Sequence, residues 1–327
     1  MQLSGIEASP LSSIDIMFSM EQELIPLSPS RCQTCDDCSW RYYCVYHLKL
    51  PELKSKAQTR GIIVHKVLEI FLNKKCYKYV NEIFKFKKIN IKNPIYKFTY
   101  NLVKKNNLLD ELDTILDMIF IGLQTDFRCI GNKSIQSEIR FDLIDTQYNF
   151  RLKGIIDVLA DMESHVLIRD YKTSKNKKTQ KDLTSDIQGM MYSLAGYKLF
   201  NKQPKMQFLY LRFPKKPIQD YIYPLEQLDG LKLYLSKVQQ KIQQFNFNDA
   251  TKNFAKGGFK WRMLCGTGNV GEHTCAFMKP FCYYAIVDDD GGIIKTSFTS
   301  NIKSKENQTL IKKYYNGCPA HYENNTI

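Results

Sequence analysis

The chain has 327 residues, a mass of 38.2 kDa and 43% hydrophobic residues, enough to bury one large core. Its net charge of +14 is spread along most of the chain and predicts a polyanionic partner. No window offers the roughly 18 consecutive apolar residues of a membrane span, and residues 1–20 lack the charged and apolar regions of a signal peptide. We therefore expect a soluble, intracellular protein of the cytoplasm, nucleoid or nucleus, with no membrane partner.

The first third of the chain combines clustered cysteines with helical patterns. Cys32, Cys35, Cys38 and Cys44 lie within the stretch RCQTCDDCSWRYYC. In a reducing compartment, such cysteines indicate metal or cluster ligands before disulfides. A helix is predicted from about Ala57 to Leu72, and residues 73–127 read as a basic, mostly helical insertion.

From about residue 135 the apolar pattern changes to a period of two. The stretches SEIRFDL, NFRLKGIIDVLAD and HVLIRDYKT predict three successive strands joined by short turns. A helix over about 182–200, a strand at KMQFLYLRF and a helix near LEQLDGLKLYLSKVQQKIQQF follow. The prediction is an α/β fold with a central mixed sheet flanked by helices.

Two aspartates interrupt the apolar runs of neighbouring strands. Side chains alternate along a strand, so Asp170 and Lys172 share one face, and a hairpin brings Asp157 of the preceding strand close to Asp170. Carboxylates held together suit Mg²⁺ or Mn²⁺, and with a lysine they can hydrolyse a phosphodiester. The alternative is a salt bridge in an ordinary hairpin.

Four further residues support the catalytic interpretation by their order and spacing. His65 can supply an imidazole ligand, Glu138 lies on the first strand of the meander, and Gln188 and Tyr192 are spaced to share a helix face. Each is weak evidence alone, since a single helical histidine is usually structural. Together they are much harder to attribute to chance.

The motifs RGIIVH, SEIRF, GIID, DYKTS and QGMMY resemble, in this order, those of the PD-(D/E)XK nuclease superfamily. The resemblance is to the RecB-like branch, which includes CRISPR-adaptation exonucleases and the nuclease domains of recombination helicase-nucleases, with a restriction-endonuclease-like core. It implies that His65, Asp157, Asp170 and the backbone carbonyl of Tyr171 bind the metal. Lys172 would be catalytic, Glu138 an additional acidic residue, and Gln188 and Tyr192 would position the nucleic acid.

The stretch SPSRCQTCDDCSWRYYCVYHLKLP resembles the entry segment of the same branch. In its iron-sulfur members, the cysteine matched by Cys38 joins three C-terminal cysteines around a [4Fe-4S] cluster. Cys265, Cys275 and Cys282 would be these three, although the spacing between the first two departs from the family, and Cys318 could replace Cys265. The rival reading is a Zn²⁺ site formed by Cys32, Cys35, Cys38 and Cys44.

The predicted organisation is a single nuclease domain over residues 1–296, followed by a polar tail at 297–327. Within the domain lie an entry segment at 27–56, the insertion at 73–127, a catalytic core at 135–247 and a cysteine clasp at 257–285.

The predicted function is metal-dependent hydrolysis of DNA, exonucleolytic on single-stranded ends, in recombination, repair or replication. The rivals are a non-catalytic nucleic-acid-binding subunit and an RNA-directed nuclease. The sequence has no Walker-type loop, so a helicase or recombinase partner would have to supply ATP-driven unwinding.

Overall fold

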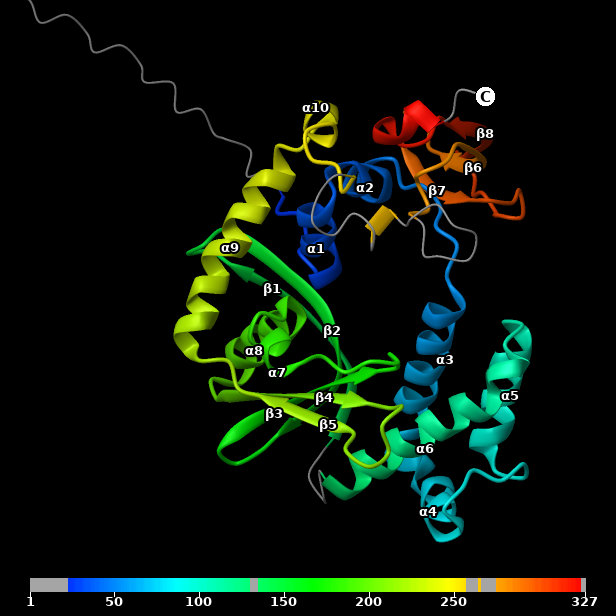
Figure 1. Cartoon of the computed structure of the whole chain (residues 1–327), viewed down its shortest axis with the longest axis vertical. Coiled ribbons are helices and arrows are strands. Elements are labelled where there is room, and N and C mark those ends of the chain that lie inside the picture. Colours follow the sequence, from blue (N-terminus) through cyan, green and yellow to red (C-terminus); the bar gives the residue numbers. More distant parts are fainter. Residues whose placement is uncertain (1–22, 130–134, 257–263, 266–274, 325–327) are drawn as a thin grey trace, which may run out of the picture.

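The computed structural model describes residues 23–129, 135–256, 264–265 and 275–324 (Figure 1). Its centre is a mixed sheet in the order β1-β2-β3-β4-β5. All neighbouring strands are antiparallel except β3 and β4, which are parallel. The predicted α/β fold is confirmed. The strands are β1 (Ile135–Asp145), β2 (Phe150–Asp161), β3 (His165–Lys172), β4 (Gln203–Tyr210) and β5 (Ile218–Tyr221).

One face of the sheet is covered by α1 (Pro29–Asp37), α8 (Ile187–Phe200) and α9 (Leu225–Gln243). A parallel strand pair needs a crossover connection, and α7 (Gln180–Thr184) with α8 supplies it between β3 and β4. A Cβ at Gly196 would lie 2.6 Å from Cδ1 of Ile168. Helix α8 therefore rests directly on β3, the strand that carries Asp170.

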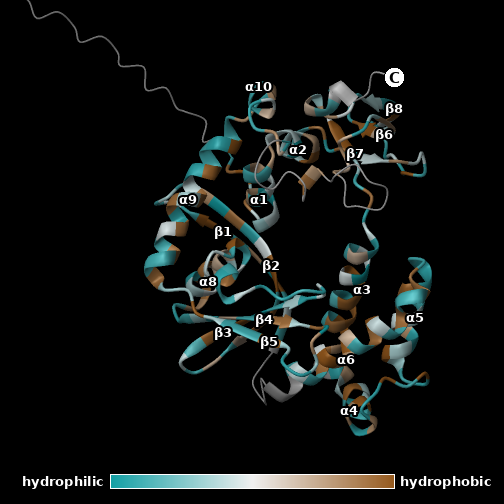
Figure 2. Ribbon diagram, in the orientation of Figure 1, coloured by the Kyte–Doolittle hydropathy of each residue, from teal (hydrophilic) through white to brown (hydrophobic). Residues whose placement is uncertain are grey.

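The other face is covered by α3 (Lys56–Phe71) and α6 (Leu112–Cys129), and α4 (Tyr77–Phe86) and α5 (Pro94–Lys105) pack against these two helices. Short 3₁₀ turns, Lys74–Cys76 and Leu109–Glu111, connect them. Figure 2 shows that α5 is largely hydrophilic, while α3 and α6 carry more of the apolar residues. The exposed lysines of this region are Lys75, Lys78, Lys85, Lys87, Lys88, Lys92, Lys97, Lys104 and Lys105.

The entry segment is attached to the sheet at its start and to the C-terminal region at its end. Leu27 forms a parallel bridge with Leu152 of β2. Helix α2 (Ser39–Tyr42) and a π-helical turn (Tyr43–His47) follow α1, and the short helix α10 (Phe247–Ala250) packs against α2. The indole N–H of Trp40 donates to the hydroxyl of Tyr315 at 2.7 Å.

A second, antiparallel sheet in the order β7-β6-β8 lies beside the entry segment (Figure 1). It comprises β6 (Phe281–Val287), β7 (Ile293–Ser297) and β8 (Thr309–Tyr315), and a 3₁₀ turn at Pro319–Asn324 follows. Residues 297–327, expected as a polar tail, thus contribute a strand to a folded sheet. Most of the expected cysteine clasp at 257–285 lies outside the described residues. No helix in the described ranges has both the length and the apolar character needed to cross a membrane.

Candidate active site

The two aspartates lie where β2 and β3 diverge. Backbone pairing between these strands ends at Val158 and Arg169, so Asp157 and Asp170 occupy the next positions of the two strands. The backbone N–H of Tyr171 donates to Oδ2 of Asp157 at 2.7 Å. A carboxylate thus takes the amide hydrogen that an adjoining strand would otherwise accept, and it ties the two strands together at the site.

His65 projects from α3 toward the same point. Its Nδ1 lies 2.9 Å from Oδ1 of Asp157, and its Nε2 lies 3.2 Å from the carbonyl oxygen of Tyr171. Helix α3 approaches closely because Gly61 has no side chain: a Cβ there would lie 3.2 Å from Oγ1 of Thr173. Three of the four predicted metal-binding groups are therefore in mutual contact.

Both partners of the His65 ring are acceptors, so both contacts can be hydrogen bonds at the same time only when both ring nitrogens carry a proton. Burial alone would lower the pKa of His65, but the neighbouring carboxylate of Asp157 outweighs it and raises that pKa. The contacts of the ring therefore favour its protonated form.

Lys172 is held by a polar network between β3 and α8. Its Nζ lies 2.6 Å from Oδ2 of Asp170 and donates to Oε1 of Gln188 at 2.6 Å. The amide nitrogen of Gln188 donates to Oδ1 of Asp170 at 2.7 Å and to the hydroxyl of Tyr192 at 3.3 Å. Asp186 caps the start of α8 by accepting the backbone N–H of Gln188. This cap fixes where the helix begins and so positions Gln188 in its first turn.

Burial and the ion pair between Asp170 and Lys172 act in opposite directions on the pKa values of these two groups. Asp170 is only 3% exposed, and burial raises its pKa, opposed by Lys172 and reinforced by Asp157. Burial alone would lower the pKa of Lys172, but the ion pair with Asp170 outweighs it and raises that pKa. The ammonium form of Lys172 is therefore the stable one at neutral pH.

Glu138 lies on β1 in an uncommon backbone conformation. Its φ is +54°, in the left-handed region that costs a non-glycine residue energy. The register of the flanking pairs, Ser137–Val158 and Ile139–Ile156, sets Glu138 opposite Asp157. Burial raises the pKa of Glu138, and the charge of Asp157 adds to the rise. Glu138 places a third carboxyl group next to the two aspartates, on the β1 side of the site.

The donor set suits a hard divalent cation. Carboxylate and carbonyl oxygens with one imidazole are ligands that Mg²⁺ and Mn²⁺ accept. Oδ2 of Asp170 is buried and accepts no well-aligned hydrogen bond, although Lys172 lies close to it. Within the described ranges, no three histidine, cysteine or acidic side chains are already disposed around a metal position. The ring nitrogen of His65 that binds a cation would have to give up its present contact, while the other nitrogen could keep its own.

A buried ion pair lies under the site on the insertion side of the sheet. The guanidinium of Arg169 contacts Asp126 of α6, and both side chains are fully buried. Asp126 also accepts the hydroxyl of Tyr171 at 2.5 Å, and Arg169 donates to Gln207 of β4 at 2.6 Å. Sequence reasoning missed this pair. Its available signal was an aspartate near the C-terminal end of the apolar α6, and an arginine on the β3 face opposite Asp170.

Cysteines from both ends of the described chain line one cavity of about 240 Å³. They are Cys38, Cys265, Cys275 and Cys318. Burial raises the pKa of Cys265 to about 11 and that of Cys318 to about 12, so without a bound cation these thiols stay protonated at neutral pH. Three of the four cysteines expected for a cluster are thus brought together, and Cys318 joins them. The fourth, Cys282, is exposed on β6 and does not line the cavity.

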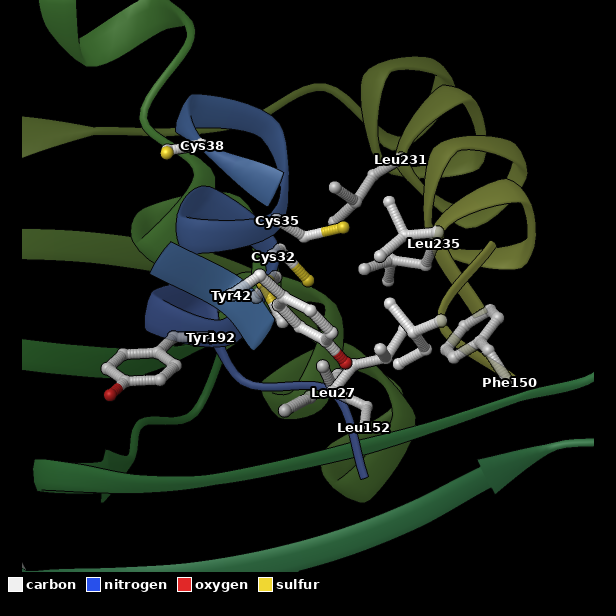
Figure 3. Close-up of a cluster of buried hydrophobic side chains, with 14 of the residues drawn as sticks. Leu27, Cys32, Cys35, Cys38, Tyr42, Phe150, Leu152, Tyr192, Leu231 and Leu235 are labelled. Atoms are coloured by element: carbon white, nitrogen blue, oxygen red, sulfur yellow. The ribbon is translucent and has the colours of Figure 1, made fainter. Parts of the chain in front are cut away.

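The alternative zinc set is divided between two environments. Figure 3 shows Cys32 and Cys35 directed toward Leu231 and Leu235 of α9, whereas Cys38 points away from them. Burial raises the pKa of Cys32 to about 12. Cys38 lines the cavity described above and Cys32 and Cys35 do not. No three of these side chains are grouped around a metal position within the described residues, so this run does not assemble a four-thiolate site there.

An Asp on one strand of a hairpin, followed on the next by Asp-Tyr-Lys, is the pattern after which one nuclease class is named. The model of the PD-(D/E)XK nuclease superfamily matches residues 26–277. The chain belongs to this superfamily, and the class of reaction is phosphodiester hydrolysis. The β7-β6-β8 sheet lies beyond the matched residues.

Solved structures resemble the chain only distantly. A provisionally assigned exonuclease of Eubacterium rectale shares 11% identity, with a TM-score of 0.46, over 81% of this chain and 96% of its own. The protein SSO0001 shares 16% identity, with a TM-score of 0.28, over 57% of this chain and 88% of its own. No curated protein sequence matches the chain.

The buried phenol of Tyr171 should contribute to stability. We expect Tyr171→Phe to lower the free energy of unfolding by about 1–3 kcal/mol, because fully buried Asp126 loses a hydrogen-bond donor. Tyr234→Phe is the matched control, since its hydroxyl donates to Asp36 at the same 2.5 Å but at the surface. The control should change the value by less than about 0.5 kcal/mol. Equal losses in urea unfolding of the two variants would contradict the prediction.

Metal binding should displace a proton from His65. Because the imidazolium form is stabilised by Asp157, Mn²⁺ affinity should fall as the pH drops below the raised pKa of His65. Calorimetric titration in buffers of different ionisation heat should show proton release near that pH. His65→Gln should bind Mn²⁺ more weakly and without this release. A proton count that is the same in wild type and variant would rule out His65 as its source.

Proposed function

We propose that the chain is a Mg²⁺- or Mn²⁺-dependent DNA nuclease that acts exonucleolytically on single-stranded ends. The observation that carries the proposal is the position of Lys172. Its ammonium is held between Asp170 and Gln188. The residue before it on β3, Tyr171, has its carbonyl oxygen next to His65. A half-buried lysine paired with one aspartate of a two-aspartate site is an arrangement suited to phosphoryl chemistry.

The residues divide the work by position. His65, Asp157, Asp170 and the carbonyl of Tyr171 would hold the cation. A bound divalent ion would polarise a phosphoryl oxygen and lower the pKa of the attacking water. Lys172 would orient that water and offset the charge that develops on the phosphate, while Gln188 keeps the ammonium in place. Tyr192, linked to Gln188, would contact the strand near the scissile bond.

Two hollows adjoin the site and support access by a strand. One, of about 1070 Å³, is lined by Gln188 and Tyr192, and the other, of about 620 Å³, by His65 and Glu138. Lys54, Lys66 and Arg140 line the second hollow together with Glu69 and Glu138, and Lys66 pairs with Glu69 at 2.7 Å. Lys54 and Arg140 are the cations that could meet a phosphate backbone there.

Preference for DNA and for single-stranded ends rests on the resemblance to RecB-like nucleases. An RNA substrate would need the same chemistry, and a helicase or recombinase partner would supply unwound ends. The rival function is a non-catalytic nucleic-acid-binding subunit. Such subunits often lose the acidic residues or the lysine, and here Asp157, Asp170 and Lys172 are all present and in contact with partners.

The cysteine-lined cavity supports a [4Fe-4S] cluster as a second cofactor. Thiolates are the ligands of such clusters, and Cys38, Cys265, Cys275 and Cys318 share one cavity. The proposed ligand set therefore differs from the sequence expectation by Cys318 in place of Cys282. Zinc bound by the same four thiols is the alternative.

Removing the lysine should abolish cutting without unfolding the protein. We expect Lys172→Ala to lower the rate of hydrolysis at least about a hundredfold, because a charge that acts mainly on the transition state is lost. The assay is a gel of end-labelled single- and double-stranded DNA, and of RNA, with Mg²⁺, Mn²⁺ or EDTA. The label pattern also gives the polarity of degradation.

Lys175→Ala is the matched control, since it removes an exposed lysine from the segment that follows β3. It should cut at close to the wild-type rate. Cutting by Lys172→Ala at the wild-type rate would show that the site is misplaced. Binding without cutting by the wild type would favour the non-catalytic subunit.

The cluster should depend on Cys318 and not on Cys282. Protein purified without oxygen should be brown, with absorbance near about 400 nm, and Cys318→Ser should lose this colour. Cys282→Ser should keep it, because Cys282 is exposed and outside the cavity. A colourless wild type that contains zinc would reject the cluster, and colour loss only in Cys282→Ser would reject this ligand set.

A further inference from the structure

One face of the β7-β6-β8 sheet carries exposed aromatic, aliphatic and lysine side chains, and this sheet lies outside the residues that match the nuclease family. Paired residues of neighbouring strands share a face. Tyr314 pairs with Cys282, Tyr284 with Lys312, and Ile286 with both Leu310 and Lys295. These pairs place two tyrosines and two lysines on one side of the sheet.

The other side of the sheet is turned inward. Tyr283, Ala285 and Tyr315 are buried, and the hydroxyl of Tyr315 meets Trp40 of the entry segment. On the outer side, by contrast, Tyr314 is 62% exposed and Leu310 is 37% exposed, and Lys295 and Lys312 are also exposed. Large exposed rings and aliphatic side chains on one face usually mark an interaction surface.

Charge identifies the occupant. The three strands contain no aspartate or glutamate, so the lysines of the outer face have no acidic neighbour on it. The nearby carboxylates are Asp288 to Asp290 in the β6–β7 turn and Glu306 in the β7–β8 loop. The turn follows the Ile286–Lys295 pair and lies at the opposite end of β6 from Cys282 and its partner Tyr314, so the ring and Lys312 are the part of the face farther from it. An uncovered ring beside lysines is the composition on which bases stack while phosphates are neutralised.

We propose that this face binds single-stranded nucleic acid, through stacking on Tyr314 and phosphate contacts from Lys295 and Lys312. It would be an accessory binding site for the nucleic-acid strand, outside the residues that match the nuclease family. The inference rests on the proposed function only in that the bound strand is the substrate. Binding itself requires no hydrolysis.

The test measures the affinity of the full-length protein for a fluorescein-labelled oligothymidylate by fluorescence anisotropy, in EDTA so that no cutting occurs. Tyr314→Ala should weaken binding about tenfold, within the range for one stacked base. Tyr314→Phe keeps the ring and should bind like the wild type. Thermal unfolding of each variant confirms that the fold is retained.

The two lysines are tested by salt dependence. Each phosphate contact on a single strand contributes about 0.7 to the slope of log affinity against log salt. Lys295→Ala/Lys312→Ala should therefore lower the slope by roughly 1.4. Lys303→Ala/Lys305→Ala removes the same charge from the exposed β7–β8 loop and should lower it much less.

Three results would overturn the proposal. They are unchanged affinity in Tyr314→Ala, equal slopes in the two double variants, and loss of self-association in Tyr314→Ala with affinity retained, which would make the face an interface between copies. Failure of the proposed function has a different signature. A wild type that binds through Tyr314 yet never cuts would remove the nuclease activity and leave this surface standing.

Discussion

The separation of β2 from β3 at Asp157 and Asp170 is the constraint on which the site depends. Strands that stay paired would bury both carboxylates against backbone, whereas here the Asp157 carboxylate accepts the Tyr171 amide and keeps the diverging strands in register. The same departure frees the Tyr171 carbonyl to face His65. One side-chain hydrogen bond therefore aligns groups from α3, β2 and β3 without a loop, and such rigid elements hold a site more exactly than loops do.

The helical insertion is coupled to this point through the opposite face of β3. Asp126 of α6 binds both Arg169 and Tyr171, the residues on either side of Asp170. Burying an ion pair gains little net stability, because desolvation offsets the attraction, but losing one partner is costly. The main effect of the pair is to fix the position of β3 relative to α6. Through it, the packing of a region far from the chemistry bears on where Asp170 points.

Local pattern predicted the first four strands of the sheet, and α3 to within one residue of Lys56–Phe71, because periodicity and motif order are properties of short stretches. It could not reveal Asp126 and Arg169, which meet across 43 positions. It also favoured Cys282 over Cys318, since spacing along the chain does not tell which side of a strand a thiol occupies. The β7-β6-β8 sheet escaped notice because its strands are short and separated by polar residues, so no run of alternating side chains stood out from its surroundings.

The contact between Trp40 and Tyr315 joins segments 275 positions apart. Loop closure over such a span is slow, and contacts of this kind form late. During synthesis, the five-stranded sheet can be completed while Trp40 and Cys44 still lack Tyr315 of β8, which contacts both. The packing of the entry segment therefore stays incomplete until β8 has been made.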